Sequence, residues 1–121
     1  MTGSVEGEEF FSPDESAVAI YRALAAPLVA GEDVAVRVTK SQVAFRARRA
    51  FAFAWAPGRY VRSVVPVVVS FALRQPLSSP RFKEVAHSSA RVWMHHVELK
   101  TVDDVDEEVR AWLKAAYAEA R

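Results

Sequence analysis

The adjacent histidines His95 and His96 are the residues whose chemistry stands out most in this sequence of 121 residues. They lie in the segment WMHHVEL, close to Glu98. Histidine titrates near neutral pH, so an imidazole beside a carboxylate can work as an acid–base pair. Neighbouring side chains of a β-strand point to opposite faces, so the two histidines cannot chelate one metal ion together. An enzyme using His96 with Glu98 is therefore one hypothesis.

A structural role fits the histidine pair better than catalysis does. His95 would share a strand face with Trp93, Val97 and Leu99. We expect a helix to cover that apolar face and His95 to be buried, hydrogen-bonded and neutral. We expect His96 on the opposite, exposed face. No obvious nucleophile accompanies His96 and Glu98 in the sequence, so we assign no catalytic residue.

Composition limits the other kinds of site. The chain has no cysteine, which excludes disulfides, thiolate metal sites and thiol catalysis. Its four glycines are too dispersed for a phosphate-binding loop. Acidic residues cluster near both expected helix starts and could hold a hard cation, so a metal-binding module is an alternative. Favourable charge at helix ends is the simpler interpretation. We assign no metal ligand and no cofactor.

Both ends of the chain are predicted to be helical. Ser12 is the expected N-cap of the first helix, with Pro13 at its first position and Glu15 three residues after the cap. A weaker cap signal, Thr101 with Asp104, precedes the second helix. Apolar residues at helical spacing follow both signals: Ala17, Ile20, Tyr21, Leu24 and Leu28, then Val105, Val109, Trp112, Leu113, Ala116 and Tyr117.

Period-two alternation predicts strands in the middle of the chain, at about 34–39, 43–47, 51–55, 67–74, 82–86 and 91–99. The register of the second and third strands depends on the turn between them. A two-residue turn would pair Phe45 with Ala52 and put the large residues of the two strands on opposite faces. A three-residue loop would pair Phe45 with Phe53 and Val43 with Trp55 on one face. We favour the three-residue loop.

These elements predict a two-layer α+β fold. An antiparallel sheet of about five to six strands would have the N- and C-terminal helices packed on one face. Residues 1–9 would be a flexible acidic N-terminus and 10–121 a single domain. The other sheet face would be small, basic and wettable, formed by Arg37, Ala44, Arg46, Ala52, Ala54, Ser70, Ala72 and Arg74.

The charges are strongly segregated although the net charge is only +1. Residues 34–100 hold twelve basic and two acidic side chains, between acidic ends. Some of the arginine excess can reflect genomic composition. No apolar run reaches the ~20 residues of a membrane span, and the acidic N-terminus is unlike a signal peptide. We therefore expect no membrane association and a cytoplasmic location.

The basic face suggests a binding function. We expect it to hold an anionic group through Arg37, Lys40, Arg46 and Arg74, with His96 tuning the site near neutral pH. An anionic small molecule and an acidic protein segment fit equally well as partners. Nucleic acid is less favoured. RNA-binding sheets expose aromatic rings on which bases stack, whereas the aromatic residues of this sheet are expected in the core. The oligomeric state stays open, a dimer included.

The segments Phe10-Phe11, 36–45, 51–53, 93–99 and the closing 109–117 form a pattern. Over residues 8–120 this pattern resembles a bacterial family, domain of unknown function number 5655. The family is distantly similar to small α+β domains of the YdhG type, some described as frataxin-like iron chaperones. Its relatives occur attached to other uncharacterised or nuclease-associated modules. The resemblance implies a binding or accessory domain and supplies no catalytic residues.

Overall fold

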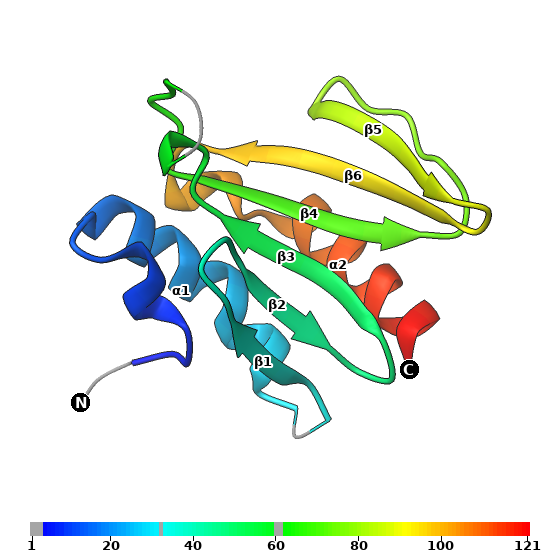
Figure 1. Ribbon diagram of the computed structural model, residues 1–121, viewed down its shortest axis with the longest axis horizontal. Coiled ribbons are helices and arrows are strands. Elements are labelled where there is room, and N and C mark those ends of the chain that lie inside the picture. The colour runs from blue at the N-terminus through cyan, green and yellow to red at the C-terminus, as the bar shows by residue number, and fades with distance from the viewer. Residues whose placement is uncertain (1–3, 32, 60–61) are drawn as a thin grey trace.

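A six-stranded antiparallel sheet is the centre of the fold, in a computed structural model that describes residues 4–31, 33–59 and 62–121. The strand order is β1-β2-β3-β4-β6-β5, so neighbours in space are also neighbours in sequence except for β4 and β6 (Figure 1). The expected α+β architecture is confirmed. The strands are β1 Ala35–Val38, β2 Val43–Arg46, β3 Ala50–Trp55, β4 Val67–Leu73, β5 Phe82–Ser89 and β6 Val92–Leu99.

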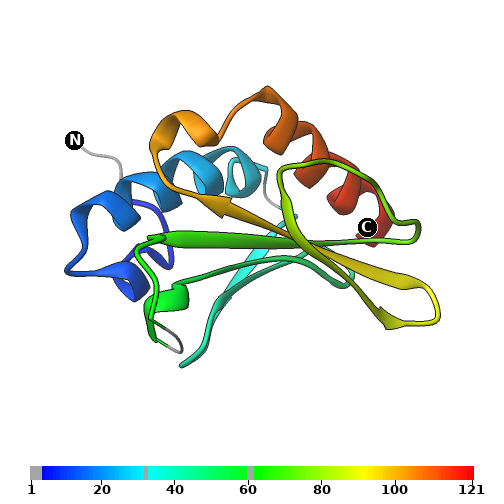
Figure 2. The same ribbon diagram turned by 90° about the horizontal axis from the view of Figure 1, so that it is seen from above.

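Both long helices, α1 (Glu15–Val29) and α2 (Glu107–Ala120), cover the same face of the sheet, as Figure 2 shows. The short 3-10 helices are η1 (Glu8–Phe11), η2 (Pro57–Arg59) and η3 (Val102–Asp104). Among the described residues, none of the helices has the length and apolar character needed to cross a membrane.

The helix caps differ from the expected ones by a few residues. Asp14, not Ser12, caps α1, and its carboxylate accepts a hydrogen bond from the backbone N–H of Ala17 (3.1 Å). Asp106 caps α2 in the same way. The Thr101–Asp104 signal belongs to η3, which precedes α2. Carboxylate caps satisfy backbone N–H groups that have no partner within the helix.

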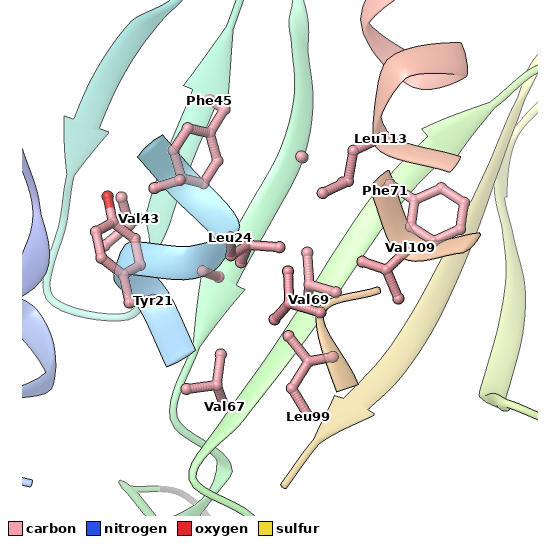
Figure 3. Close-up of a cluster of buried hydrophobic side chains, with 14 of the residues drawn as sticks. Tyr21, Leu24, Val43, Phe45, Val67, Val69, Phe71, Leu99, Val109 and Leu113 are labelled. Carbon is pink, nitrogen blue, oxygen red and sulfur yellow. The ribbon is translucent and has the colours of Figure 1, made fainter. Parts of the chain in front are cut away.

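The core lies between the helices and the sheet. Leu24 of α1 and Leu113 of α2 pack over the strands (Figure 3), and each is 2% exposed. Burying a side chain of this size is worth about 1.5–3 kcal/mol. Other large, fully buried side chains come from four of the strands and from α1: Phe45, Phe51, Phe71, Leu99, Ile20 and Tyr21.

The segment before α1 makes specific contacts from residue 5 onward, within the part assigned above to a flexible N-terminus. Gly7 has a φ of 95°, and a Cβ at this position would lie 2.5 Å from the hydroxyl of Tyr21. That hydroxyl donates to the carbonyl of Glu6. The guanidinium of Arg22 donates twice to the carboxylate of Glu8, at 2.8 and 2.7 Å. A left-handed backbone and a close neighbour therefore both require glycine at position 7.

The register of β2 and β3 corrects the sequence interpretation. Arg46 faces Ala50 across a three-residue turn, but Phe45 faces Ala52, so Phe51 is an extra residue in a β-bulge. Phe51 is 1% exposed, and its ring lies 5.7 Å from the ring of Tyr117 in α2. The bulge thus keeps one phenylalanine under the helix and shifts the alternation of every later residue in β3.

The shifted alternation reverses the faces expected for β3. Ala52 and Ala54 lie under the helices, where both are 0% exposed. Phe53 and Trp55 lie on the opposite face, where both are half-buried. The expectation that these two aromatic residues join the core is wrong, because a regular ladder was assumed where the chain has a bulge.

Candidate functional site

The sheet face turned away from α1 and α2, here called the open face, is the candidate site. Pairing registers place six residues of this face in one row across all six strands. The row begins with a base, continues through an aromatic ring and a serine–histidine pair, and ends with an acid: Arg37, Ala44, Phe53, Ser70, His96 and Glu84.

A chain of hydrogen bonds fixes His96 on the open face. The indole Nε1 of Trp55 donates to Oγ of Ser70 (3.0 Å), and Oγ of Ser70 lies 2.6 Å from Nδ1 of His96. Indole is only a donor, so Ser70 accepts from Trp55. Ser70 is buried, so its own proton needs an acceptor within the protein, and we assign Nδ1 of His96 as that acceptor. His96 is therefore the tautomer with its proton on Nε2. The edge of the Trp55 ring also packs against the imidazole, at 6.4 Å between centroids.

The surroundings of His96 favour its neutral form. Burial lowers the pKa of His96 below its ordinary value, and the nearby carboxylate of Glu84 only partly opposes this effect. His96 can thus offer one N–H, at Nε2, to an acceptor on a ligand.

The geometry does not assemble the acid–base pair considered from the sequence. The carboxylate of Glu98 accepts from the ammonium of Lys83 (3.0 Å), while His96 is engaged by Ser70. Ser70 is 2% exposed, so its hydroxyl is not accessible to a substrate as a nucleophile would have to be. Ser70 acts on this face by positioning the imidazole.

His95 has the role expected for it. It is 0% exposed on the helix side of the sheet, and its ring stacks on Phe71 with 5.0 Å between centroids. The backbone N–H of Leu77 donates to Nε2 (3.0 Å), so the ring proton lies on Nδ1, 3.4 Å from the carbonyl of Phe71. Burial lowers the pKa of His95. One imidazole therefore holds the loop after β4 onto the core.

The residues expected to bind an anion are spread along the sheet. Arg37 and Arg46 are exposed on the open face of neighbouring strands. Lys40 lies in the turn after β1, and the backbone N–H of Arg74 donates to the carboxylate of Glu119 near the end of α2. The Cα atoms of Arg37 and His96 are four strand spacings apart, and at ~4.8 Å per spacing this distance is about 19 Å. The structure brings Arg37 and Arg46 together and places His96 in the Arg37 row, but it does not gather all five residues.

The turn between β2 and β3, which contains Arg48 and Arg49, donates hydrogen bonds to the C-terminus of α2. The backbone N–H groups of Arg48 and Arg49 both donate to the carbonyl of Ala120, at 3.0 and 3.1 Å. The guanidinium of Arg49 donates to the carbonyl of Glu119 (2.8 Å). Helices carry partial negative charge at this end, so these contacts stabilise α2.

The aromatic side chains of the open face were missed by the sequence analysis. Phe53 and Trp55 were assigned to the core, and the open face was expected to present alanine at their place. Alanine alternates with large residues in AFAFAW, residues 50–55. This pattern allows either the alanines or the large residues to face the core. The β-bulge decides between these two orientations, and it could not be recognised from the sequence.

The acidic helix starts are used in capping and ion pairing. Asp106 and Glu108 both contact the guanidinium of Arg81 at 3.0 Å. Among the described residues, no three side chains of the types that bind metals lie close enough together to hold an ion.

Comparison with known proteins identifies the family of the chain and nothing more specific. No match to the curated proteins or to the solved structures was found. The sequence profile of one family matches residues 6–120, which is nearly the whole chain. The chain therefore belongs to the family described as domain of unknown function DUF5655.

Proposed function

We propose that the protein is a binding module whose open face holds a nucleotide, either free or within a single strand. The observation that carries the proposal is the cross-strand row in which Arg37, Phe53 and His96 share one face. These side chains offer a phosphate-binding cation, a stacking surface and a hydrogen-bond donor. A nucleotide has one chemical group suited to each of them.

The stacking part rests on Phe53 and its neighbour Ala44. Ala44 lies between Arg37 and Phe53 in the row, which separates these two residues by two strands, about 10 Å. The methyl side chain of Ala44 leaves room above this part of the sheet. A base lying there contacts the Phe53 ring while its phosphate reaches Arg37.

The charge distribution orients such a ligand. Arg37 and Arg46 stand on the β1–β2 side of the open face, and Glu84 and Glu98 stand on the β5–β6 side. Lys83 forms an ion pair with Glu98, and within the described part of the chain no ion pair engages Glu84. The phosphate is therefore attracted to the β1–β2 side and repelled from the other side. His96, between the two sides, donates from Nε2 to a base or sugar oxygen.

The test is fluorescence anisotropy with a labelled single-stranded oligothymidylate of twelve nucleotides, and competition by AMP, polyphosphate and polyglutamate. A stacking contact of this kind is worth ~1–3 kcal/mol, so Phe53→Leu should weaken strand binding by roughly 5- to 150-fold. The double change Arg37→Ala with Arg46→Ala should reduce the salt dependence of binding. The matched control, Arg91→Ala with Lys100→Ala, removes the same charge elsewhere.

The competitors separate the sources of the ligand. If AMP displaces the probe at a nucleotide concentration similar to that of unlabelled oligothymidylate, the ligand is a free nucleotide. If only the oligothymidylate competes, the ligand is a nucleic acid. Strand binding that is insensitive to Phe53→Leu, or displaced equally well by polyglutamate, contradicts the proposal and leaves charge attraction alone. Unchanged thermal midpoints of the variants show that the fold is intact.

A further inference from the structure

A groove of about 590 Å³ separates α1 from α2 in the helix layer, on the other side of the sheet from the open face. Its described lining comes from α1, from the segment after α1 and from α2. Small-molecule sites have volumes of roughly 300–1,000 Å³ and mostly apolar walls. The groove meets both conditions.

The floor and one wall of the groove are apolar. Leu24 and Leu113 form its base, and each is 2% exposed. Pro27 and Leu28 form the α1 side. An aliphatic group lying along these residues would be removed from water over most of its length, which is the main source of binding energy for such a group.

The α2 wall is cationic. Arg110 and Lys114 are exposed and four residues apart, so they lie on one side of the helix. Within the described part of the chain neither forms an ion pair. Both cations are therefore available to an anion in the groove.

Two acids, Asp33 and Glu107, also line the groove, and Asp33 is engaged by Tyr117. The hydroxyl of Tyr117 donates to the carboxylate of Asp33, a contact that closes one end of the groove and raises the pKa of Tyr117. Glu107 lines the groove three residues before Arg110, toward the start of α2. The groove thus has an apolar wall opposite an α2 wall that carries two cations, Arg110 and Lys114, and one acid, Glu107.

We propose that this groove binds an amphipathic anion, an alkyl carboxylate whose chain lies over Leu24, Leu28 and Leu113 and whose head group binds Arg110 and Lys114. Two walls of different character are complementary to the two parts of such a molecule. The proposal is independent of the open face, which lies on the opposite side of the sheet.

The experiment measures binding of decanoate, decylamine and 1-decanol by calorimetry, at concentrations below those at which they form micelles. The variant is Arg110→Glu with Lys114→Glu, which reverses two exposed charges. The control is Arg91→Glu with Lys100→Glu, which makes the same charge change outside the groove. Comparing octanoate with decanoate tests the role of the alkyl chain of the ligand, because each added methylene should tighten binding by up to about fourfold.

Decanoate should bind the wild-type protein in a saturable way and more tightly than decylamine. The groove variant should bind decanoate about tenfold or more weakly, as expected on loss of a charge-assisted contact, and the control variant should bind it normally. Methyl NMR shifts of the wild-type protein should centre on Leu28, a readout that needs no variant. Absence of saturable binding, equal binding of decylamine, equal weakening in the control, or shifts centred on another surface would each overturn the proposal.

Discussion

Oγ of Ser70 in β4 lies 2.6 Å from Nδ1 of His96 in β6, and this contact sets the chemistry of the open face. Ser70 accepts from Trp55, and because Ser70 is buried we assign its own proton to the imidazole. The only donor left on a neutral His96 is then Nε2. A buried serine thereby decides which hydrogen bond a half-buried histidine can offer.

Replacing Ser70 with alanine should change both the protonation of His96 and the stability of the fold. The neutral imidazole loses the hydroxyl that donates to Nδ1, so its pKa should rise toward the ordinary value, as measured by NMR titration of the ring. Trp55 loses the acceptor of its indole N–H, which should cost about 1–3 kcal/mol of unfolding free energy. The matched control is Ser88→Ala, an exposed serine of β5. A His96 pKa unchanged by Ser70→Ala would contradict the assigned direction of the hydrogen bond.

The two neighbouring histidines should differ in their importance for stability. His95→Ala leaves the N–H of Leu77 without its acceptor and opens a cavity beside Phe71, so it should lower the free energy of unfolding by about 3 kcal/mol. His96→Ala, at the half-buried position, should cost about 1 kcal/mol. Urea unfolding of both variants provides the measurement. A larger loss for His96→Ala would show that the contacts of His95 contribute little.

Much of the fold could be predicted from the sequence, because its determinants are local. Helical spacing of apolar residues indicated α1 and α2, and alternation in WMHHVEL placed His95 on the core side and His96 on the open side. Local patterns also indicated where the helices begin, to within a few residues. The α1 cap was placed two residues early because Ser12-Pro13 and Asp14 are both acceptable helix starts.

The chemistry of the open face could not be predicted in the same way. It depends on the bulge at Phe51, which satisfies a contact with Tyr117 far away in the sequence. Once β3 shifts by one residue, Phe53 and Trp55 exchange faces with Ala52 and Ala54. The contact between Ser70 and His96 likewise depends on the pairing of two strands that are separated in the chain by β5.

The register of β3 can be tested by enlarging an alanine on each face. Ala54→Leu introduces three carbon atoms at a position that is 0% exposed under the helices, and overpacking of this kind costs typically 1–3 kcal/mol. Ala44→Leu makes the same change on the open face and should alter the free energy of unfolding much less. Chemical denaturation of the two variants compares them directly. Equal effects, or a greater loss for Ala44→Leu, would be incompatible with the observed register.

The stability of the protein should fall as the pH decreases from 7.5 to 5. Burial lowers the pKa of both His95 and His96 in the folded state, whereas in the unfolded chain each titrates near 6.5. Below pH 6.5 the unfolded state therefore binds more protons, and the free energy of unfolding must decrease, by at most about 1.4 kcal/mol per pH unit for each histidine. The contribution is fully present above pH 6.5 and is lost as the pH falls toward the folded-state pKa values.

A carboxylate effect can be separated from this one by its pH range. The guanidinium of Arg22 and the backbone N–H of Val5 lower the pKa of Glu8 from 4.5 to about 2, so its contribution is lost only below pH 4.5. Urea unfolding between pH 5 and 7.5 thus reports mainly on histidine. The double variant His95→Gln with His96→Gln should have a nearly flat profile in this range, because glutamine does not titrate while its amide oxygen can still accept from Leu77. A slope that persists unchanged in the double variant would assign the pH dependence to other groups.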